Sequence, residues 1–367
     1  PSIADPFLPK KIDEGREGEI RECIGCNICV SGYHDCVPVR CTQNPTMGEE
    51  WRRGWHPERI APGDPESNAL IVGAGPAGLE CARALGQRGL AVTLAEASEE
   101  LGGRVNREST LPGLATWARV RDYRTQLIQT MANVDVYRGS PLSAQDVIDF
   151  GCDHAVIATG ALWTRQILTT EAYPITGFEG DNIYTPDDIF AGAEIESPVV
   201  IYDFNHYYMG SCLAELLRKQ GKDVTIVTTA NAVSAWTFMN NELAEIRVRM
   251  IELGIGIVLE HYLTEFSNGS AKLMSIYRDR TVHSIDCGSL LIVGSRKADD
   301  DLFQELNSDP DRLVDAGIKS LRCIGDCQLP GTIAHAVYSG HECARTIDTS
   351  DTAVPIRWER PELLTDP

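Results

Sequence analysis

Short apolar runs that end at glycine or polar residues recur along the chain, and they predict buried strands of parallel sheets. The runs at 68–72 and 91–96 flank a segment at 76–85 that predicts a helix, and Gly89 ends that helix. A strand, a helix and a second strand in this order are typical of a βαβ unit. The pattern therefore predicts such a unit between residues 68 and 96.

A second βαβ unit of similar element lengths follows further along the chain. Its strands are expected at 198–204 and 222–228, and its helix at 211–220. The remaining strands of this region, one of them in a meander, are expected at 254–260, 271–277 and 289–293. The sequence thus predicts an α/β protein with two Rossmann-like folds.

Composition and charge narrow the classes of function. The chain has 367 residues, of which 43% are hydrophobic, so it is long enough for two or three domains with packed cores. Its formal net charge of −20 argues against nucleic acid and anionic membranes, because both select for Lys and Arg. No apolar run approaches the roughly 18 residues that cross a bilayer. We therefore expect a cytoplasmic protein that binds neither nucleic acid nor membranes.

Five of the 12 cysteines lie before residue 42, and Cys23, Cys26 and Cys29 have the spacing Cys-x-x-Cys-x-x-Cys. Three such thiolates can turn inward from one loop. This spacing suits a [4Fe–4S] cluster, which four cysteines hold, better than zinc, whose ligands usually come as two separated pairs. Free thiols are the third alternative. Cys36 and Cys41 are each close enough in the sequence to supply the fourth ligand, and the spacing leaves the choice between them open.

Arg21 to Cys29, followed by Cys41-Thr-Gln-Asn, resembles the iron–sulfur segment of the trimethylamine, dimethylamine and histamine dehydrogenase family. The 2,4-dienoyl-CoA reductases are more distant relatives of that family. In the family, the cysteine of Cys-Thr-Gln-Asn is the fourth cluster ligand. The resemblance therefore implies a cluster held by Cys23, Cys26, Cys29 and Cys41, with Cys36 as a bystander.

The opening segment Ser2 to Lys11 resembles the same family at the place where its N-terminal FMN-bearing (β/α)₈ barrel leads into the cluster segment. The segment has no strong helix or strand period, and the chain starts at Pro1 without Met. We therefore expect a piece of a longer polypeptide that lacks the barrel. The FMN and the amine-oxidising site would lie in the missing half.

The first βαβ unit carries a dinucleotide fingerprint. Gly73, Gly75 and Gly78 follow its first strand with the spacing Gly-x-Gly-x-x-Gly. The first glycine makes a tight turn, the second admits a pyrophosphate, and the third lets the helix pack on the strand. The helix N-terminus attracts the phosphates. Glu96, at the end of the second strand, is placed to bond the adenosine ribose.

Three further segments resemble flavoproteins of the disulfide reductase type: Leu101-Gly-Gly-Arg104, Asp153 to Gly160, and Leu321 to Asp326. In such proteins the paired glycines approach the nucleotide, and the Gly-Asp lies beside the pyrophosphate. Arg104 either faces the phosphates or lies in a solvated loop. The full set of expected nucleotide contacts is Gly73, Gly75, Pro76, Ala77, Gly78, Glu96, Ala97, Gly103, Arg104, Thr159, Gly160 and Asp326.

The second of these segments is the turn by which such chains leave the nucleotide domain, and the third is the return strand. We therefore expect a cluster segment followed by two nucleotide-binding folds of the flavoprotein disulfide reductase type, the second inserted in the first. The linker at 51–66 is expected to be extended. The expected units are 1–66, with the end of the barrel, the cluster segment and the linker; 67–195 with 318–367, an ADP- or FAD-type domain; and 196–317, a degenerate NAD(P)-like domain.

The second fold has lost the glycine triplet. Asp203-Phe-Asn-His-Tyr-Tyr208 stands in its place, and these side chains would fill the space of a pyrophosphate, while the acidic residue would repel phosphate. We therefore expect no NAD(P) in this fold. By resemblance, a reductase fed by NAD(P)H keeps the second fingerprint, whereas amine dehydrogenases pass electrons to a soluble electron-transfer flavoprotein. The loss favours the amine dehydrogenases.

The resemblance implies the electron-transfer and nucleotide-binding half of an amine dehydrogenase. Its expected partners are the FMN barrel, an electron-transfer flavoprotein and a second copy in a homodimer. In these dehydrogenases ADP occupies the place where related reductases hold FAD, so we expect ADP, with FAD as the alternative. No catalytic residue is expected in this chain. The rival hypotheses are a NAD(P)H-dependent reductase with FAD and a [4Fe–4S] cluster, and a non-enzymatic electron-relay or regulatory subunit.

Overall fold

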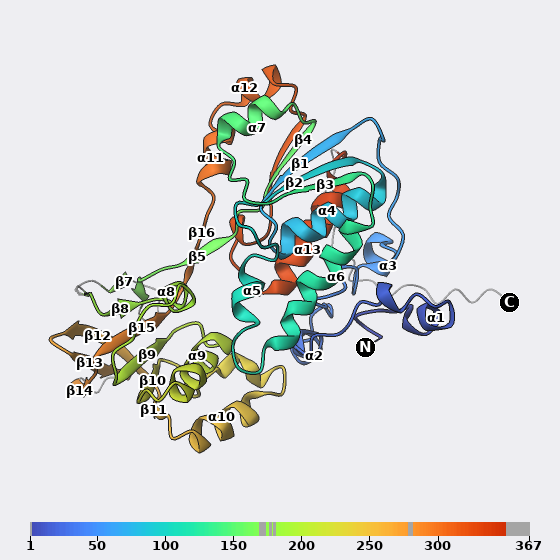
Figure 1. The fold of residues 1–367 in the computed structure, drawn as a ribbon. Helices are drawn as coiled ribbons and strands as arrows, with labels where there is room; N and C mark the ends of the chain where they lie inside the picture. Colours follow the sequence, from blue (N-terminus) through green and yellow to red (C-terminus); the bar gives the residue numbers. More distant parts are fainter. Residues whose placement is uncertain (1, 169–173, 176–177, 179–180, 278–281, 350–367) are drawn as a thin grey trace.

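The first sheet contains five parallel strands and forms the centre of one nucleotide-type fold (Figure 1). The computed structural model describes residues 2–168, 174–175, 178, 181–277 and 282–349. The sheet order is β17-β4-β1-β2-β3. Its strands are β1 (Asn68–Val72), β2 (Ala91–Ala95), β3 (Val134–Tyr137), β4 (His154–Ile157) and β17 (Ser320–Cys323).

Helices cover both faces of this sheet. Ala69 and Ile71 of β1 pack with residues of α4 and α13 on one face, while Leu70 and Val72 pack towards α7 and α11 on the other. This alternation is what a central parallel strand requires. The helices of this fold are α4 (Pro76–Arg88), α5 (Arg104–Glu108), η2 (Ala115–Ala118), α6 (Arg119–Gln129), α7 (Ala144–Phe150), α11 (Asp301–Asn307), α12 (Pro310–Asp315), η4 (Gly325–Cys327) and α13 (Ile333–Thr346).

The second sheet also contains five parallel strands, in the order β11-β10-β9-β15-β8. A three-stranded antiparallel meander, β12-β13-β14, packs on one face of it, and α9 covers the other. The elements are β8 (Ile183–Tyr184), α8 (Pro186–Phe190), β9 (Val199–Asp203), α9 (Tyr208–Lys219), β10 (Val224–Thr228), η3 (Ala235–Phe238), α10 (Leu243–Glu252), β11 (Gly256–Val258), β12 (His261–Ser267), β13 (Ser270–Ser275), β14 (Val282–Asp286) and β15 (Ser289–Val293).

The chain leaves the first fold and returns to it along one short ribbon. β5 (Ala161–Trp163) follows β4, and it pairs in antiparallel fashion with β16 (Arg296–Ala298), which precedes β17. Figure 1 shows this ribbon between the two sheets. The predicted fold class, with one Rossmann-type fold inserted in another, is therefore confirmed. A separate two-stranded pair consists of β6 (Ile167–Leu168) and β7 (Pro174–Ile175).

The boundaries of the three predicted units stay a prediction. β8 lies before residue 196 in the sequence, but it forms the edge of the second sheet through its parallel pairing with β15. The N-terminal unit contains α1 (Leu8–Asp13), η1 (Glu17–Glu19), α2 (Ile28–His34) and α3 (Glu50–Arg53).

The expectation of an extended linker at 51–66 was wrong at its start, where α3 forms one helical turn. The reason is Glu49, which is fully buried and pairs with both Arg52 and Arg53, three and four residues further on. This spacing is met only on a helix. Gly54 then ends the turn in the left-handed conformation.

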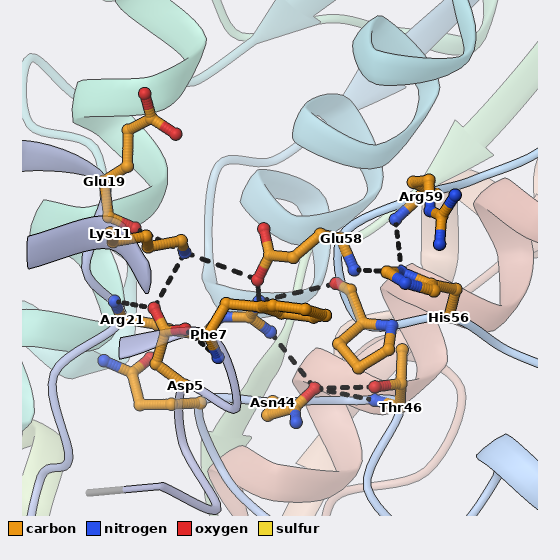
Figure 2. Close-up of polar contacts among 12 residues, drawn as sticks. Asp5, Phe7, Lys11, Glu19, Arg21, Asn44, Thr46, His56, Glu58 and Arg59 are labelled. Carbon is orange, nitrogen blue, oxygen red and sulfur yellow. Dashed lines mark hydrogen bonds and ion pairs between the residues drawn. The ribbon is translucent and has the colours of Figure 1, made fainter. Parts of the chain in front are cut away.

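A buried set of charges folds the N-terminal segment onto itself (Figure 2). Asp5 accepts hydrogen bonds from Lys11 Nζ at 2.8 Å and from the Arg21 backbone N–H at 2.8 Å. Arg21 also donates to Glu58 Oε1 at 2.8 Å and to Asn44 Oδ1 at 3.1 Å. Because Asn44 follows Cys41 closely, these bonds fix the end of the cysteine segment.

A second buried network joins the cysteine segment to the first nucleotide fold. Arg124 of α6 is fully buried, and its Nε lies 2.8 Å from Glu80 Oε2 of α4. The same guanidinium donates to Gln43 Oε1 at 2.9 Å and to the Gln43 carbonyl at 3.1 Å. Burial acts to raise the pKa of Glu80, but the charges of Arg83 and Arg124 hold that pKa well below its usual value.

Glu80→Gln tests this network, because it keeps the size of the side chain but leaves Arg83 and Arg124 buried without a counter-charge. Removing one partner of a buried ion pair typically costs about 3–5 kcal/mol. We therefore expect a clearly lower midpoint of urea-induced unfolding, as measured by circular dichroism. Glu14→Gln is the control, since Glu14 pairs with Arg16 on the surface, and it should leave the midpoint unchanged. Equal midpoints for the two variants would contradict the role given to Glu80.

Candidate functional site

A cavity of about 670 Å³ lies at the carboxyl ends of β1, β2 and β4. Ligands of open α/β sheets bind at this edge. The structure brings the expected nucleotide contacts together around this cavity, with the exception of Gly78. The expected residues that line it are Gly73, Gly75, Pro76, Ala77, Glu96, Ala97, Gly103, Arg104, Thr159, Gly160 and Asp326.

The glycine-rich turn has the geometry of a phosphate cradle. Gly73 has a φ of 102°, and a Cβ there would lie 2.4 Å from the Ala158 carbonyl. A Cβ on Gly78 would lie 1.9 Å from the Gly73 carbonyl, so this glycine packs α4 on the turn and does not face the cavity. Gly75 has no atom near its missing Cβ, and it precedes α4 without a side-chain cap. The first N–H groups of α4 are therefore open to an anion.

Glu96 is fixed at the rim of the cavity by its own loop. Its Oε2 accepts the Ala74 N–H at 2.7 Å, and its Oε1 accepts the Ser98 N–H at 2.9 Å and the Ser98 hydroxyl at 2.8 Å. A carboxylate has about four lone-pair sites. Glu96 can therefore still accept hydrogen bonds from the hydroxyls of a ribose.

Two arginines and one aspartate form a wall at the end of the cavity. Asp326 Oδ2 lies 2.5 Å from Arg296 Nη1 and 3.2 Å from Arg104 Nε. Both guanidinium groups also donate to the Gly331 carbonyl, at 2.6 Å from Arg296 and 2.9 Å from Arg104. The Trp163 ring centroid lies 5.6 Å from the Arg296 guanidinium carbon. Arg104 is therefore not in a solvated loop, since it belongs to this wall.

The wall also borders a second cavity, of about 880 Å³. Arg104 lines both cavities, Asp326 lines the first, and Arg296 and Trp163 line the second. The sequence prediction missed Arg296, because β16 carries no recognisable motif. The one available signal was an arginine three residues after the end of the apolar strand at 289–293.

The turn of the second fold is closed by its own side chain. Asp203 is fully buried, and its Oδ1 accepts the backbone N–H groups of Asn205 and His206, both at 3.1 Å. A Cβ on Gly210 of α9 would lie 2.6 Å from the Asp203 carboxyl carbon. Burial raises the pKa of Asp203 to about 7. The Asp203 side chain thus occupies space between the turn and α9.

The structure places Cys23 and Cys26 on one loop, Cys29 in the first turn of α2, and Cys41 on the segment packed beside them. Cys26 Sγ lies 3.1 Å from Thr42 Oγ1, which joins the first part of the motif to the Cys41 segment. Burial raises the pKa of Cys26 to about 11 and also raises the pKa of Cys41. Other cysteines of the predicted set raise both pKa values further, because neighbouring thiolates would repel each other. Cys36 is exposed, and its sulfur lies 4.0 Å from the His34 carbonyl.

This donor set fits a thiolate-held metal group in its chemistry. Buried thiols with a raised pKa become thiolates when a cation binds them. The backbone N–H groups of Gln43 and Asn44 hydrogen-bond the Cys41 sulfur and favour its thiolate. Within the described ranges, however, no three His, Cys, Asp or Glu side chains already stand in the arrangement of a metal site.

The second cavity runs from the cysteine segment to an exposed apolar surface. Cys26 and Thr42 line it, together with Trp236, Phe238 and Leu329. The last three residues are 66%, 66% and 75% exposed, which is unusual for large apolar side chains that lie together. Among the described residues, no helix has the length and apolar character needed to span a membrane.

Comparisons with known proteins agree with this arrangement. The chain is 37% identical to dimethylamine dehydrogenase from Hyphomicrobium sp. (strain x), over 96% of its own length and 51% of that protein. It matches the structure of histamine dehydrogenase from Rhizobium sp. 4-9 with a TM-score of 0.94 and 46% identity, covering 100% of this chain and 57% of that one. It also matches 6-hydroxypseudooxynicotine amine oxidase from Pseudomonas geniculata N1, with a TM-score of 0.91 and 40% identity, covering 95% of this chain and 52% of that one.

The resemblance to the amine dehydrogenases is therefore confirmed, and the chain spans about half the length of these relatives. Residues 67–340 match the family model described as pyridine nucleotide-disulphide oxidoreductase. This range includes both Rossmann-type folds and the ribbon that joins them. The chain belongs to the pyridine nucleotide-disulphide oxidoreductase family.

Proposed function

We propose that this chain is the electron-transfer and nucleotide-binding half of an amine dehydrogenase. A [4Fe–4S] cluster held by Cys23, Cys26, Cys29 and Cys41 would supply one-electron transfer between an FMN in a barrel partner and an electron-transfer flavoprotein. The oxidation of a small amine would take place in the barrel. This proposal is supported by similarity to dimethylamine and histamine dehydrogenases over nearly the whole chain.

The observation that carries the choice of a dehydrogenase is the closed turn of the second fold. An NAD(P)H-dependent reductase needs a pyrophosphate site there, and the Asp203 carboxylate fills that space between β9 and α9. This leaves the chain without a site for the nicotinamide donor in its second fold. The same observation counts against the reductase hypothesis. The closed turn does not test the third hypothesis, a non-enzymatic relay or regulatory subunit. A barrel in the same native polypeptide would exclude that hypothesis.

We further propose that the first fold holds ADP and not FAD. The cradle at Gly75 and the carboxylate of Glu96 suit the diphosphate and the ribose. The wall of Arg104, Asp326 and Arg296 stands where a longer dinucleotide would continue into the second cavity. Opening it would leave buried charges without partners, which is costly. The wall therefore favours a ligand that ends at its second phosphate.

The exposed apolar surface at Trp236, Phe238 and Leu329 supports a partner domain beside the cluster segment. An FMN-bearing barrel is the partner that we propose, since the chain spans only about half of its relatives. An electron-transfer flavoprotein as acceptor, a homodimeric assembly and a cytoplasmic location complete the proposal.

The cluster ligands can be separated by two single substitutions. Cys41→Ala should abolish the brown colour of anaerobic preparations and the expected content of about four irons per chain. Cys36→Ala should leave both unchanged, because the resemblance assigns the fourth ligand to Cys41 of Cys-Thr-Gln-Asn and leaves Cys36 as a bystander. Iron analysis and the visible spectrum measure the difference. The opposite result would move the fourth ligand to Cys36, and stoichiometric zinc without iron would end the cluster proposal.

The nucleotide site can be tested at Gly75, whose φ of −70° accepts a side chain and whose missing Cβ faces open space. Gly75→Val should therefore fold normally but release the nucleotide, since its side chain fills the phosphate cradle. Chromatography of heat-extracted supernatants should show about one ADP per wild-type chain and almost none for the variant.

Asn205→Val is the matched control at the corresponding turn of the second fold, and it should leave bound ADP unchanged. Stoichiometric FAD in the wild-type extract would favour the reductase hypothesis. If Asn205→Val lost ADP and Gly75→Val retained it, the nucleotide would bind in the second fold, and the proposal would be contradicted.

A further inference from the structure

Two cysteines outside the cluster segment lie in contact behind the nucleotide cavity. Cys323 is the last residue of β17, and Cys327 is the last residue of η4. Their sulfurs are 3.1 Å apart, about 1 Å more than the length of a disulfide bond. The turn between them includes Gly325, which has a φ of 65°. The fold thus presents two thiols that a small movement can join.

Hydrogen bonds prepare Cys327 to react as a thiolate. Its sulfur accepts the S–H of Cys323 and lies 3.2 Å from the hydroxyl of Thr159. These bonds, the first the stronger, lower the pKa of Cys327 to about 7 against the opposing effect of burial. The same contact raises the pKa of Cys323, which keeps the proton. With the two sulfurs 3.1 Å apart, Cys327 would act as the nucleophile and Cys323 is placed to resolve its oxidised form.

The pair is connected to the nucleotide cavity through its neighbours. Thr159 and Asp299 both contact the Cys327 sulfur, and both line the cavity. Asp326, which precedes Cys327 in the chain, is the centre of the arginine wall. Cys323 is partly exposed, whereas Cys327 is buried. Because the two sulfurs are 3.1 Å apart, a small oxidant that enters beside the partly exposed Cys323 also comes next to the Cys327 sulfur. A change in η4 would be transmitted to the cavity through Thr159, Asp299 and Asp326.

We propose that Cys323 and Cys327 form a reversible redox pair that hydrogen peroxide converts into a disulfide, and that this disulfide weakens nucleotide binding. The second half of this inference rests on the proposed ADP site. The first half depends only on the contact between the two sulfurs and their access to a small oxidant.

The chemistry balances with peroxide as the two-electron oxidant. The Cys327 thiolate attacks one peroxide oxygen, the O–O bond breaks, and a sulfenic acid and hydroxide form. The Cys323 sulfur then attacks the sulfenic sulfur, the S–O bond breaks, and the hydroxyl leaves with the Cys323 proton as water. The two cysteines lose two electrons, and the peroxide gains them. A dithiol reductant reverses the result.

Peptide mass spectrometry tests the disulfide. The purified protein is treated with a few equivalents of peroxide, its free thiols are alkylated, and it is cleaved after Arg and Glu. The peptide 323–342 contains Cys323 and Cys327 as its two cysteines. We expect this peptide to be unalkylated and lighter by two hydrogen atoms, and dithiothreitol should restore two alkylated cysteines. Two alkylated cysteines after peroxide treatment would overturn the proposal.

Variants and a binding measurement complete the test. Cys323→Ser should prevent the disulfide and drive Cys327 to higher oxidation states, while Cys152→Ser, at another buried thiol, should leave the disulfide unchanged. Calorimetric titration of protein freed of its bound nucleotide should show ADP bound about tenfold more weakly by the oxidised form than by the reduced form. Equal affinity despite the disulfide would overturn the regulatory half. Absence of ADP binding by the reduced protein would instead contradict the proposed nucleotide site.

Discussion

The buried guanidinium of Arg124 is the contact on which the arrangement of the two candidate sites depends. It pairs with Glu80 in the helix that follows the glycine-rich turn, and it donates to the side-chain oxygen and the backbone carbonyl of Gln43, two residues after Cys41. A charge without access to water must keep all of its partners. The phosphate cradle and the cysteine segment are therefore held in a fixed relation to each other.

The two nucleotide-type folds share an architecture but differ at the turn that decides binding. In the first, Gly75 leaves open space before α4. In the second, Asp203 fills the corresponding space and satisfies the backbone of its own loop. One oxygen of the Asp203 side chain thus accepts backbone N–H groups of the turn that a phosphate would otherwise meet. The inserted fold also contacts the cysteine segment, since Asn27 Nδ2 donates to the Asn240 carbonyl at 3.1 Å.

The sequence was most informative where a function is carried by consecutive residues. Gly73, Gly75 and Glu96 were found because their roles are local: a turn, a close approach, and a strand end. Arg296 and the pair at Cys327 were not found, because their importance comes from contacts between segments far apart in the chain. α3 was missed for a related reason, since it depends on a single buried Glu49. β8 is only two residues long and has no periodicity to detect.

The central claim is that this chain carries electrons but cannot take them from a nicotinamide. Electron paramagnetic resonance of the anaerobic protein tests it most directly. Dithionite should produce the signal of a reduced [4Fe–4S] cluster, and excess NADH or NADPH should produce none, because the turn at Asp203 is closed. A cluster signal with NADH or NADPH at comparable intensity would contradict the account.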